Sequence, residues 1–251
     1  MTPTLYEWGW KGMLVAAVAA FLFLYRTAAP YGRHHRPGWG PTLPARWGWF
    51  AMESVSPLVF AGVWWTTGRG APGLLVLWWL HYAYRAFIYP FRIRGGMKPM
   101  PWITAAAAVL FNLWNGAING YGAGASSGGA SGEVFPTDSP LRIVLGLALF
   151  ALGAATNHRA DAQLRALRAP GETGYRIPYG GLFRWVSCPN YLGEIVEWTG
   201  FALLAGHPAA WAFAAFTFAN LAPRARRHHA WYRETFADYP SSRRALIPFV
   251  Y

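Results

Sequence analysis

Long apolar segments, separated by arginine-rich connections, make up most of this sequence. Of its 251 residues, 54% are hydrophobic and only 13% are charged. An apolar run of about 20 residues can cross a bilayer as a helix, because a helix satisfies its own backbone hydrogen bonds there. We therefore predict an all-α, polytopic membrane protein that forms a single domain over residues 1–251, with seven transmembrane helices. The predicted spans are 8–25, 47–67, 72–91, 102–122, 141–157, 190–206 and 208–222.

The basic residues are distributed unevenly over the connections between these spans. Eighteen of the 22 lysines and arginines lie on alternate connections, in segments 26–46, 92–98 and 158–185 and in the tail after the last span. The opposite side carries a glycine- and serine-rich stretch over residues 120–132. Since basic connections stay in the cytoplasm, this alternation predicts that the N-terminus is outside and the C-terminus is cytoplasmic. We expect the cell membrane of a bacterium, or the endoplasmic reticulum of a eukaryote.

The net charge of +12 could indicate a nucleic-acid partner, but no basic helix, zinc knuckle or base-stacking motif accompanies it. The 15 tryptophans fit the interfacial belts of a membrane protein better. The single cysteine, Cys188, excludes an internal disulfide. We therefore expect a monomer in a lipid bilayer, with no nucleic acid and no metal.

Polar side chains recur at membrane depth on four of the predicted spans. A carboxylate there is costly unless it is paired, neutral or facing a cavity. Helical spacing places Asn190, Glu194 and Glu197 on one face, and Arg85 could neutralise one glutamate. Contacts between packed helices could explain each group alone, but together they predict a shared polar interior, as in a transporter or an enzyme. The polar residues on the other three spans are Glu53 on the second, His81, Tyr82, Arg85 and Tyr89 on the third, and Asn112, Asn115 and Asn119 on the fourth.

Segment 157–190, which we predict to be a cytoplasmic loop, distinguishes these two classes. It combines arginines with tyrosines, prolines and glycines, of which the positive-inside rule explains only the arginines. A phosphate-bearing dinucleotide needs forked donors, rings for stacking and small residues for close approach. No GxGxxG motif follows a strand, so a Rossmann domain is not expected. The loop therefore favours an enzyme with a dinucleotide cofactor.

Several short blocks rich in aromatic and polar residues stand between or within the apolar runs. They are Leu43-Pro-Ala-Arg-Trp-Gly-Trp-Phe50 with Glu53, His81-Tyr-Ala-Tyr-Arg-Ala-Phe-Ile-Tyr89, Pro170-Gly-Glu-Thr-Gly-Tyr-Arg-Ile-Pro178, Gly180-Gly-Leu-Phe183, Asn190-Tyr-Leu-Gly-Glu-Ile-Val-Glu-Trp198, His228-His229, Trp231-Tyr232, Phe236-Ala-Asp-Tyr-Pro240 and Ser242-Arg-Arg-Ala-Leu-Ile-Pro-Phe249. In this order, the blocks resemble the steroid 5α-reductase family of integral-membrane, NADPH-dependent reductases. A weaker likeness at residues 31–34 precedes them, and Ala107 replaces an arginine found in relatives.

The resemblance implies NADPH as cofactor, a 3-oxo-Δ4-steroid or related enone lipid as substrate, and roles for individual residues. The implied catalytic residues are Glu53 and Tyr82. The expected substrate-binding residues are Trp49, Arg85, Tyr89 and Asn115. The expected cofactor-binding residues are Arg33, Asn157, Asp161, Arg168, Tyr175, Arg176, Asn190, Glu194, Arg224, His228 and Tyr232.

The expected chemistry gives these residue types a physical reason. Hydride delivered to the β-carbon of an enone pushes charge onto the carbonyl oxygen, where hydrogen-bond donors stabilise the enolate. Tyr82 is a neutral donor at pH 7, and Glu53 can donate only when protonated, a state that burial favours. Asn190 and Glu194 would suit a nicotinamide amide, which carries both donor and acceptor atoms.

Two other classes share parts of the pattern. Isoprenylcysteine carboxyl methyltransferases have a similar membrane-embedded C-terminal half, but they bind S-adenosylmethionine and need no buried pair such as Glu53 and Tyr82. A transporter or a purely structural membrane protein is supported only by the polar interior.

Overall fold

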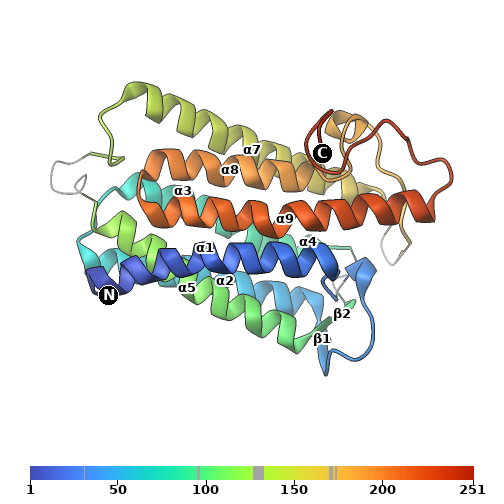
Figure 1. Cartoon of the computed structure of the whole chain (residues 1–251), viewed down its shortest axis with the longest axis horizontal. Helices are drawn as coiled ribbons and strands as arrows, with labels where there is room; N and C mark the ends of the chain where they lie inside the picture. The colour runs from blue at the N-terminus through green and yellow to red at the C-terminus, as the bar shows by residue number, and fades with distance from the viewer. Residues whose placement is uncertain (31, 95–96, 127–132, 170–171, 173) are drawn as a thin grey trace.

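The chain folds into an elongated bundle whose long helices run roughly along one axis, with the N-terminus at one end and the C-terminus toward the other (Figure 1). The computed structural model describes residues 1–30, 32–94, 97–126, 133–169, 172 and 174–251. The long helices are α1 (Pro3–Arg26), α2 (Ala45–Thr67), α3 (Pro72–Tyr82), α5 (Trp102–Gly124), α7 (Pro140–Ala166), α8 (Pro189–Ala205) and α9 (Pro208–Thr235). The shorter elements are the π-helix η2 (Ala83–Ile88) and α4 (Tyr89–Arg92), which continue α3, the 3-10 helices η1 (Gly32–His34) and η3 (Gly181–Arg184), and the strands β1 (Thr42–Pro44) and β2 (Pro99–Pro101).

The all-α prediction is confirmed, and each predicted span falls on a helix. Two helices continue well beyond their spans: α7 runs to Ala166 and α9 to Thr235. The prediction of a loop from residue 157 is therefore wrong over the first ten residues of that segment. The glycine- and serine-rich stretch also begins as helix, since α5 ends at Gly124, and its residues 127–132 lie outside the described part of the chain. The small antiparallel pair of β1 and β2 was not predicted.

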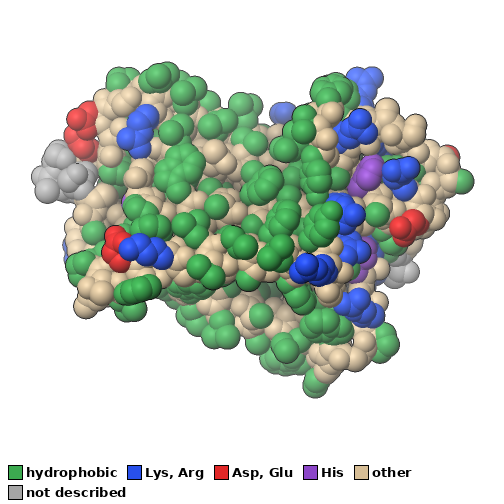
Figure 2. All heavy atoms as spheres, viewed as in Figure 1, with side chains coloured by type: hydrophobic (Ala, Val, Ile, Leu, Met, Phe, Trp, Pro, Cys, Tyr) green, Lys and Arg blue, Asp and Glu red, His purple; other side chains and the backbone are tan. Residues whose placement is uncertain are grey.

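Many large hydrophobic side chains are exposed on the outside of the bundle. Hydrophobic side chains cover much of the middle of the face in Figure 2, whereas Lys, Arg and His side chains gather toward the end that holds the C-terminal segment. Within the described residues, α1 and α7 are the two helices long and apolar enough to cross a membrane by length and composition. Seven spans, and their orientation, stay predictions.

Local sequence signals explain where several helices begin and end. The hydroxyl of Thr2 accepts the N–H of Leu5 at 3.2 Å, directly ahead of Pro3 at the first position of α1. Ser139 caps α7 in the same way. Proline suits the first turn because the N–H it lacks would have no helical partner. Helix α8 ends at Gly206, whose φ of 67° lies in the left-handed region that favours glycine.

Glycines allow α7 and α8 to approach each other closely. A Cβ placed on Gly193 would lie 2.5 Å from the backbone nitrogen of Asn157, and one on Gly153 would clash with the backbone of Glu197. Helix α2 packs against α5 and α1 against α9, which completes the bundle. The close α7–α8 contact brings Asn157 and the polar residues of α8 within hydrogen-bonding distance of one another.

An aromatic cluster around Trp78 joins α2, α3, α8 and α9. The ring of Trp78 stacks on Phe60 with centroids 4.6 Å apart and lies 5.0 Å from Trp198 and 5.5 Å from Phe213. Trp78 also lies 5.5 Å from the ring of Tyr82. Because such clusters are densely packed, they hold the Tyr82 ring in one position.

Candidate active site

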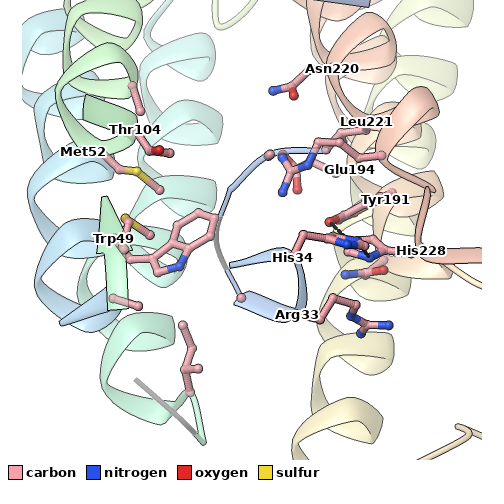
Figure 3. A pocket seen from close by; sticks show the side chains of 18 of the residues that line it. Arg33, His34, Trp49, Met52, Thr104, Tyr191, Glu194, Asn220, Leu221 and His228 are labelled. Atoms are coloured by element: carbon pink, nitrogen blue, oxygen red, sulfur yellow. Dashed lines mark hydrogen bonds between the residues drawn. The ribbon is translucent and has the colours of Figure 1, made fainter. Parts of the chain in front are cut away.

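A cavity of about 610 Å³ runs into the bundle. In Figure 3, Trp49, Met52 and Thr104 lie on one wall, formed by α2 and α5. The opposite wall, from α8 and α9, carries a second group of residues. The labelled ones are Tyr191, Glu194, Asn220, Leu221 and His228. Arg33 and His34 lie on the segment around η1 that crosses between the walls.

Most of the residues predicted for the site lie together around this cavity. The predicted residues that line it are Arg33, Trp49, Glu53, Tyr82, Arg85, Tyr89, Asp161, Arg168, Tyr175, Arg176, Asn190, Glu194, Arg224, His228 and Tyr232. Asn115 and Asn157 do not line it. Asn115 is fully buried, and its side-chain oxygen accepts a hydrogen bond of 2.9 Å from Asn119, so the structure corrects its expected contact with substrate.

Arg85 is a cation that lies close to two carboxylates in the cavity. Its guanidinium lies 3.6 Å from Asp161 Oδ2 and 3.7 Å from Glu194 Oε2, and its side chain is 13% exposed. The rings of Trp49 and Tyr89 flank it, with centroids 4.9 and 4.7 Å from the guanidinium carbon. Arg85 therefore lies beside one glutamate, Glu194, as the sequence predicted, and also beside Asp161, which was not predicted.

A hydrogen-bonded network fixes the polar face of α8. Asn157 donates to the backbone carbonyl of Asn190 at 3.0 Å and to Glu194 Oε2 at 3.3 Å. Asn190 in turn donates to Asp161 Oδ1 at 3.1 Å. Asn157 thus orients two cavity-lining residues from behind rather than facing the cavity itself.

The side chain of Glu197 does not share the cavity-facing side of α8 with Asn190 and Glu194, although the sequence predicts one face for all three. Its Oε1 lies 2.9 Å from His81 Nδ1, and its side chain is 1% exposed. Asn190 and Glu194 line the cavity, whereas Glu197 reaches it only through His81, which does line it.

One end of the cavity combines an acid and a phenol with apolar walls. Glu53 on α2 and Tyr82 at the end of α3 both line the cavity and interact electrostatically. Tyr82 is 3% exposed. The neighbouring wall is apolar, and includes Met52, Ile103, Phe111, Phe213 and Phe216. Such a slot suits a flat apolar molecule with one polar group.

Cations and aromatic rings alternate at the other end of the cavity. The Arg33 guanidinium carbon lies 4.6 Å from the ring centroid of Trp231 and 4.8 Å from that of Tyr232. Its Nη1 atom is buried and has no hydrogen-bond partner among the described residues. The ammonium of Lys98 lies 3.2 Å from the hydroxyl of Tyr175. This arrangement offers donors and ring faces to an anionic, aromatic ligand.

Arg168 and Arg176, two of the arginines expected to bind the cofactor, also line the cavity. Arg168 donates from Nε to the carbonyl of Gly174 at 2.7 Å, which places its guanidinium over the Tyr175 ring. Arg176 is exposed and lies 2.5 Å from Glu172. A hydrogen bond from the backbone N–H of Ala169 lowers the pKa of Glu172, and the nearby charge of Arg176 lowers this pKa further.

Two histidines connect η1 to α9 next to Arg33. His34 Nε2 lies 3.2 Å from His228 Nδ1, and His228 Nε2 lies 3.1 Å from the hydroxyl of Tyr191. Burial, with the nearby charge of Arg33, lowers the pKa of His34 to about 4 and holds that of His228 well below its usual range. Both rings are therefore neutral at pH 7 and act as paired donor and acceptor.

Several cavity residues were not singled out by sequence reasoning. His34 adjoins the predicted Arg33, Tyr191 adjoins the predicted Asn190, and Asn220 is a lone amide in the apolar part of α9. The amide could have been found from its membrane depth, as the other asparagines were. Ala107, which replaces an arginine of relatives, also lines the cavity.

The chain is similar to known proteins over most of its length. A family model described as 3-oxo-5-alpha-steroid 4-dehydrogenase matches residues 98–251. The chain is 41% identical to 3-oxo-5-alpha-steroid 4-dehydrogenase 1 of Bos taurus, over 93% of this chain and 92% of that protein. It is 40% identical to the Homo sapiens protein of the same name, over 93% and 90%, and 37% identical to a steroid 5-alpha-reductase of Gossypium hirsutum, over 99% and 98%.

Proposed function

Because this chain belongs to the 3-oxo-5-alpha-steroid 4-dehydrogenase family of oxidoreductases, we propose that it reduces the Δ4 double bond of a 3-oxo-Δ4-steroid, or of a related enone lipid, with NADPH. The observation that carries the proposal is one continuous cavity with two unlike ends. The apolar end, with Glu53 and Tyr82, is continuous with an end lined by arginines and aromatic rings, which we call the mouth; its residues are Arg33, Arg168, Tyr175, Arg176, Arg224 and Tyr232. This combination fits an apolar substrate placed beside an anionic cofactor.

Glu53 and Tyr82 would stabilise the charge that develops during reduction. When hydride reaches the β-carbon, the substrate oxygen becomes an enolate oxygen. The phenol of Tyr82 and the protonated carboxyl of Glu53 donate hydrogen bonds to it. The apolar walls keep water away, which strengthens both hydrogen bonds.

The described residues also fit NADPH. The buried Nη1 of Arg33 has no hydrogen-bond partner in the part of the chain that the structure describes, and Arg168, Arg176 and Arg224 line the same cavity, which suits a ligand with several phosphates. Asn190 and Glu194 supply a donor and an acceptor at the depth where a nicotinamide amide would lie. When bound, NADPH supplies the hydride, and the chain's residues orient it.

We further propose that the bundle spans a membrane seven times, with the cofactor mouth in the cytoplasm. The exposed hydrophobic side chains, the basic mouth and the alternation of basic connections support this orientation. In a Cys188→Ala background, a reagent outside intact cells should label a cysteine at Ser126 and spare one at Ser242. The reverse labelling would place the mouth on the side that lacks NADPH and would contradict the proposal.

The proposed function is tested by following NADPH absorbance with purified protein in detergent. We expect oxidation that depends on added 3-oxo-Δ4-steroid or another enone lipid, and a preference for NADPH over NADH. Tight binding of S-adenosylmethionine without binding of NADPH would instead support a methyltransferase.

A further inference from the structure

A buried, hydrogen-bonded pair, His81 and Glu197, adjoins the cavity and has no part in the function described so far. His81 belongs to α3 and Glu197 to α8, and their side chains are 7% and 1% exposed. Isolated charges are costly in such a place, and a structural contact between helices could be made by neutral groups. One member of the pair faces the cavity, which gives it access to a ligand.

The geometry fixes which atom of His81 is available. Nδ1 lies 2.9 Å from Glu197 Oε1, so the ring's other nitrogen, Nε2, is the one left for the cavity. The ring of His81 lies 5.0 Å from the ring of Tyr82 at 75°, and 4.6 Å from Trp198. His81 is therefore held next to the phenol that would bind the substrate oxygen, and in an enone the α-carbon is only two bonds from that oxygen.

We propose that His81 is the acid that protonates the α-carbon of the enolate, and that Glu197 is the positioning residue that keeps His81 charged and oriented. This inference rests on the proposed reduction of an enone. The β-carbon gains a hydride with its two electrons, the carbon–carbon π pair shifts toward the oxygen, and the α-carbon then takes a proton from Nε2. His81 is left neutral, with its Nδ1–H still bound to the Glu197 carboxylate, and solvent restores the proton.

The chemistry of the pair suits this task. A carboxylate that accepts from Nδ1 holds the imidazole in one orientation and stabilises its charged form, as in other catalytic acid–base pairs. Glu197 Oε2 has no hydrogen-bond partner among the described residues, so its charge is directed mainly at His81. The other titratable and charged groups that face the pair are Glu53 from α2, Tyr82 from α3, Arg85 from η2, His158 from α7 and Glu194 from α8.

The test is the pH dependence of kcat at saturating NADPH and steroid. An acid must be protonated to act, so the wild-type kcat should fall as pH rises, with a solvent deuterium isotope effect. His81→Gln can still bind Glu197, and it should lose about 100-fold in kcat, the usual contribution of a general acid. It should also lose the alkaline limb due to His81, whereas Glu53→Gln, which removes the other acid of the site, should keep that limb. Glu197→Gln should lower kcat at least about tenfold and move the limb to lower pH, because the imidazolium loses its counter-charge. The steroid KM and the NADPH Kd should stay within about twofold.

His158→Gln is the matched control, since this half-buried histidine lies near the pair but does not line the cavity. Its kcat profile should keep the alkaline limb. Near-normal kcat and an unchanged limb in His81→Gln would overturn the assignment. If that variant fails to fold, a wild-type kcat that stays flat to pH 9 with no solvent isotope effect would overturn it equally. A wild type without any enone turnover would instead overturn the proposed function, and with it the proton donor.

Discussion

The buried cluster around Arg85 allows a stability prediction of defined size. Replacing Arg85 with Met keeps much of the side-chain volume but removes the charge that faces Asp161 and Glu194. At the observed distances of 3.6 and 3.7 Å, each attraction is worth about 4 to 5 kcal/mol at an effective dielectric constant of about 20. The cost of removing the guanidinium from water offsets much of this attraction. We therefore expect Arg85→Met to lower the free energy of unfolding by about 3–5 kcal/mol, as when one partner of a buried ion pair is removed.

The assay is unfolding by SDS titration in mixed detergent micelles, followed by circular dichroism. Adding Asp161→Asn and Glu194→Gln to Arg85→Met should restore most of the lost stability, because the two uncompensated charges disappear while their shapes remain. The exposed Arg26 at the end of α1 provides the control, and Arg26→Met should cost less than about 1 kcal/mol. A loss below about 1 kcal/mol for Arg85→Met, or a triple variant no more stable than the single one, would refute this reasoning.

Three further predictions concern the two ends of the cavity. Glu53→Gln and Tyr82→Phe should each lower kcat at least about tenfold while NADPH binding, measured by fluorescence, stays near normal; full activity in both would remove them from the catalytic role. Arg168→Ala and Arg176→Ala should each reduce the preference for NADPH over NADH, measured as a ratio of kcat/KM, and an unchanged ratio would place the 2′-phosphate elsewhere. The folded pKa of His34, about 4, lies below its ordinary 6.5, so the unfolded chain binds more protons between those values and stability should fall as pH drops through this window. His34→Gln should flatten this part of the unfolding curve, and an identical slope in the variant would contradict the assignment.

Much of the fold followed from hydrophobicity, because each long apolar run had to form a helix. Helix ends were predicted less well, since leaving the apolar region does not by itself end a helix. Segment 158–166 contains no glycine or proline, and α7 continues to Ala166 although its residues become polar. In α9, Pro223 lies inside the helix without ending it.

Helical phase explains the errors in the predicted site. Residues three apart on a helix differ by about 60° in direction, so Asn112 can line the cavity while Asn115 is fully buried and does not. The same offset separates Glu194 from Glu197. The pairing of Glu197 with His81, and the crossing of η1 beside α9, depend on contacts between distant segments that no local pattern specifies.

The central claim is that this cavity transfers hydride from NADPH to the β-carbon of an enone. The most direct measurement uses NADPH deuterated at the transferring position of the nicotinamide, with mass spectrometry and NMR of the product. We expect one deuterium at the β-carbon, a solvent-derived proton at the α-carbon, and a greatly reduced yield from Glu53→Gln. A reduced product without cofactor deuterium, or with deuterium at another carbon, would contradict it.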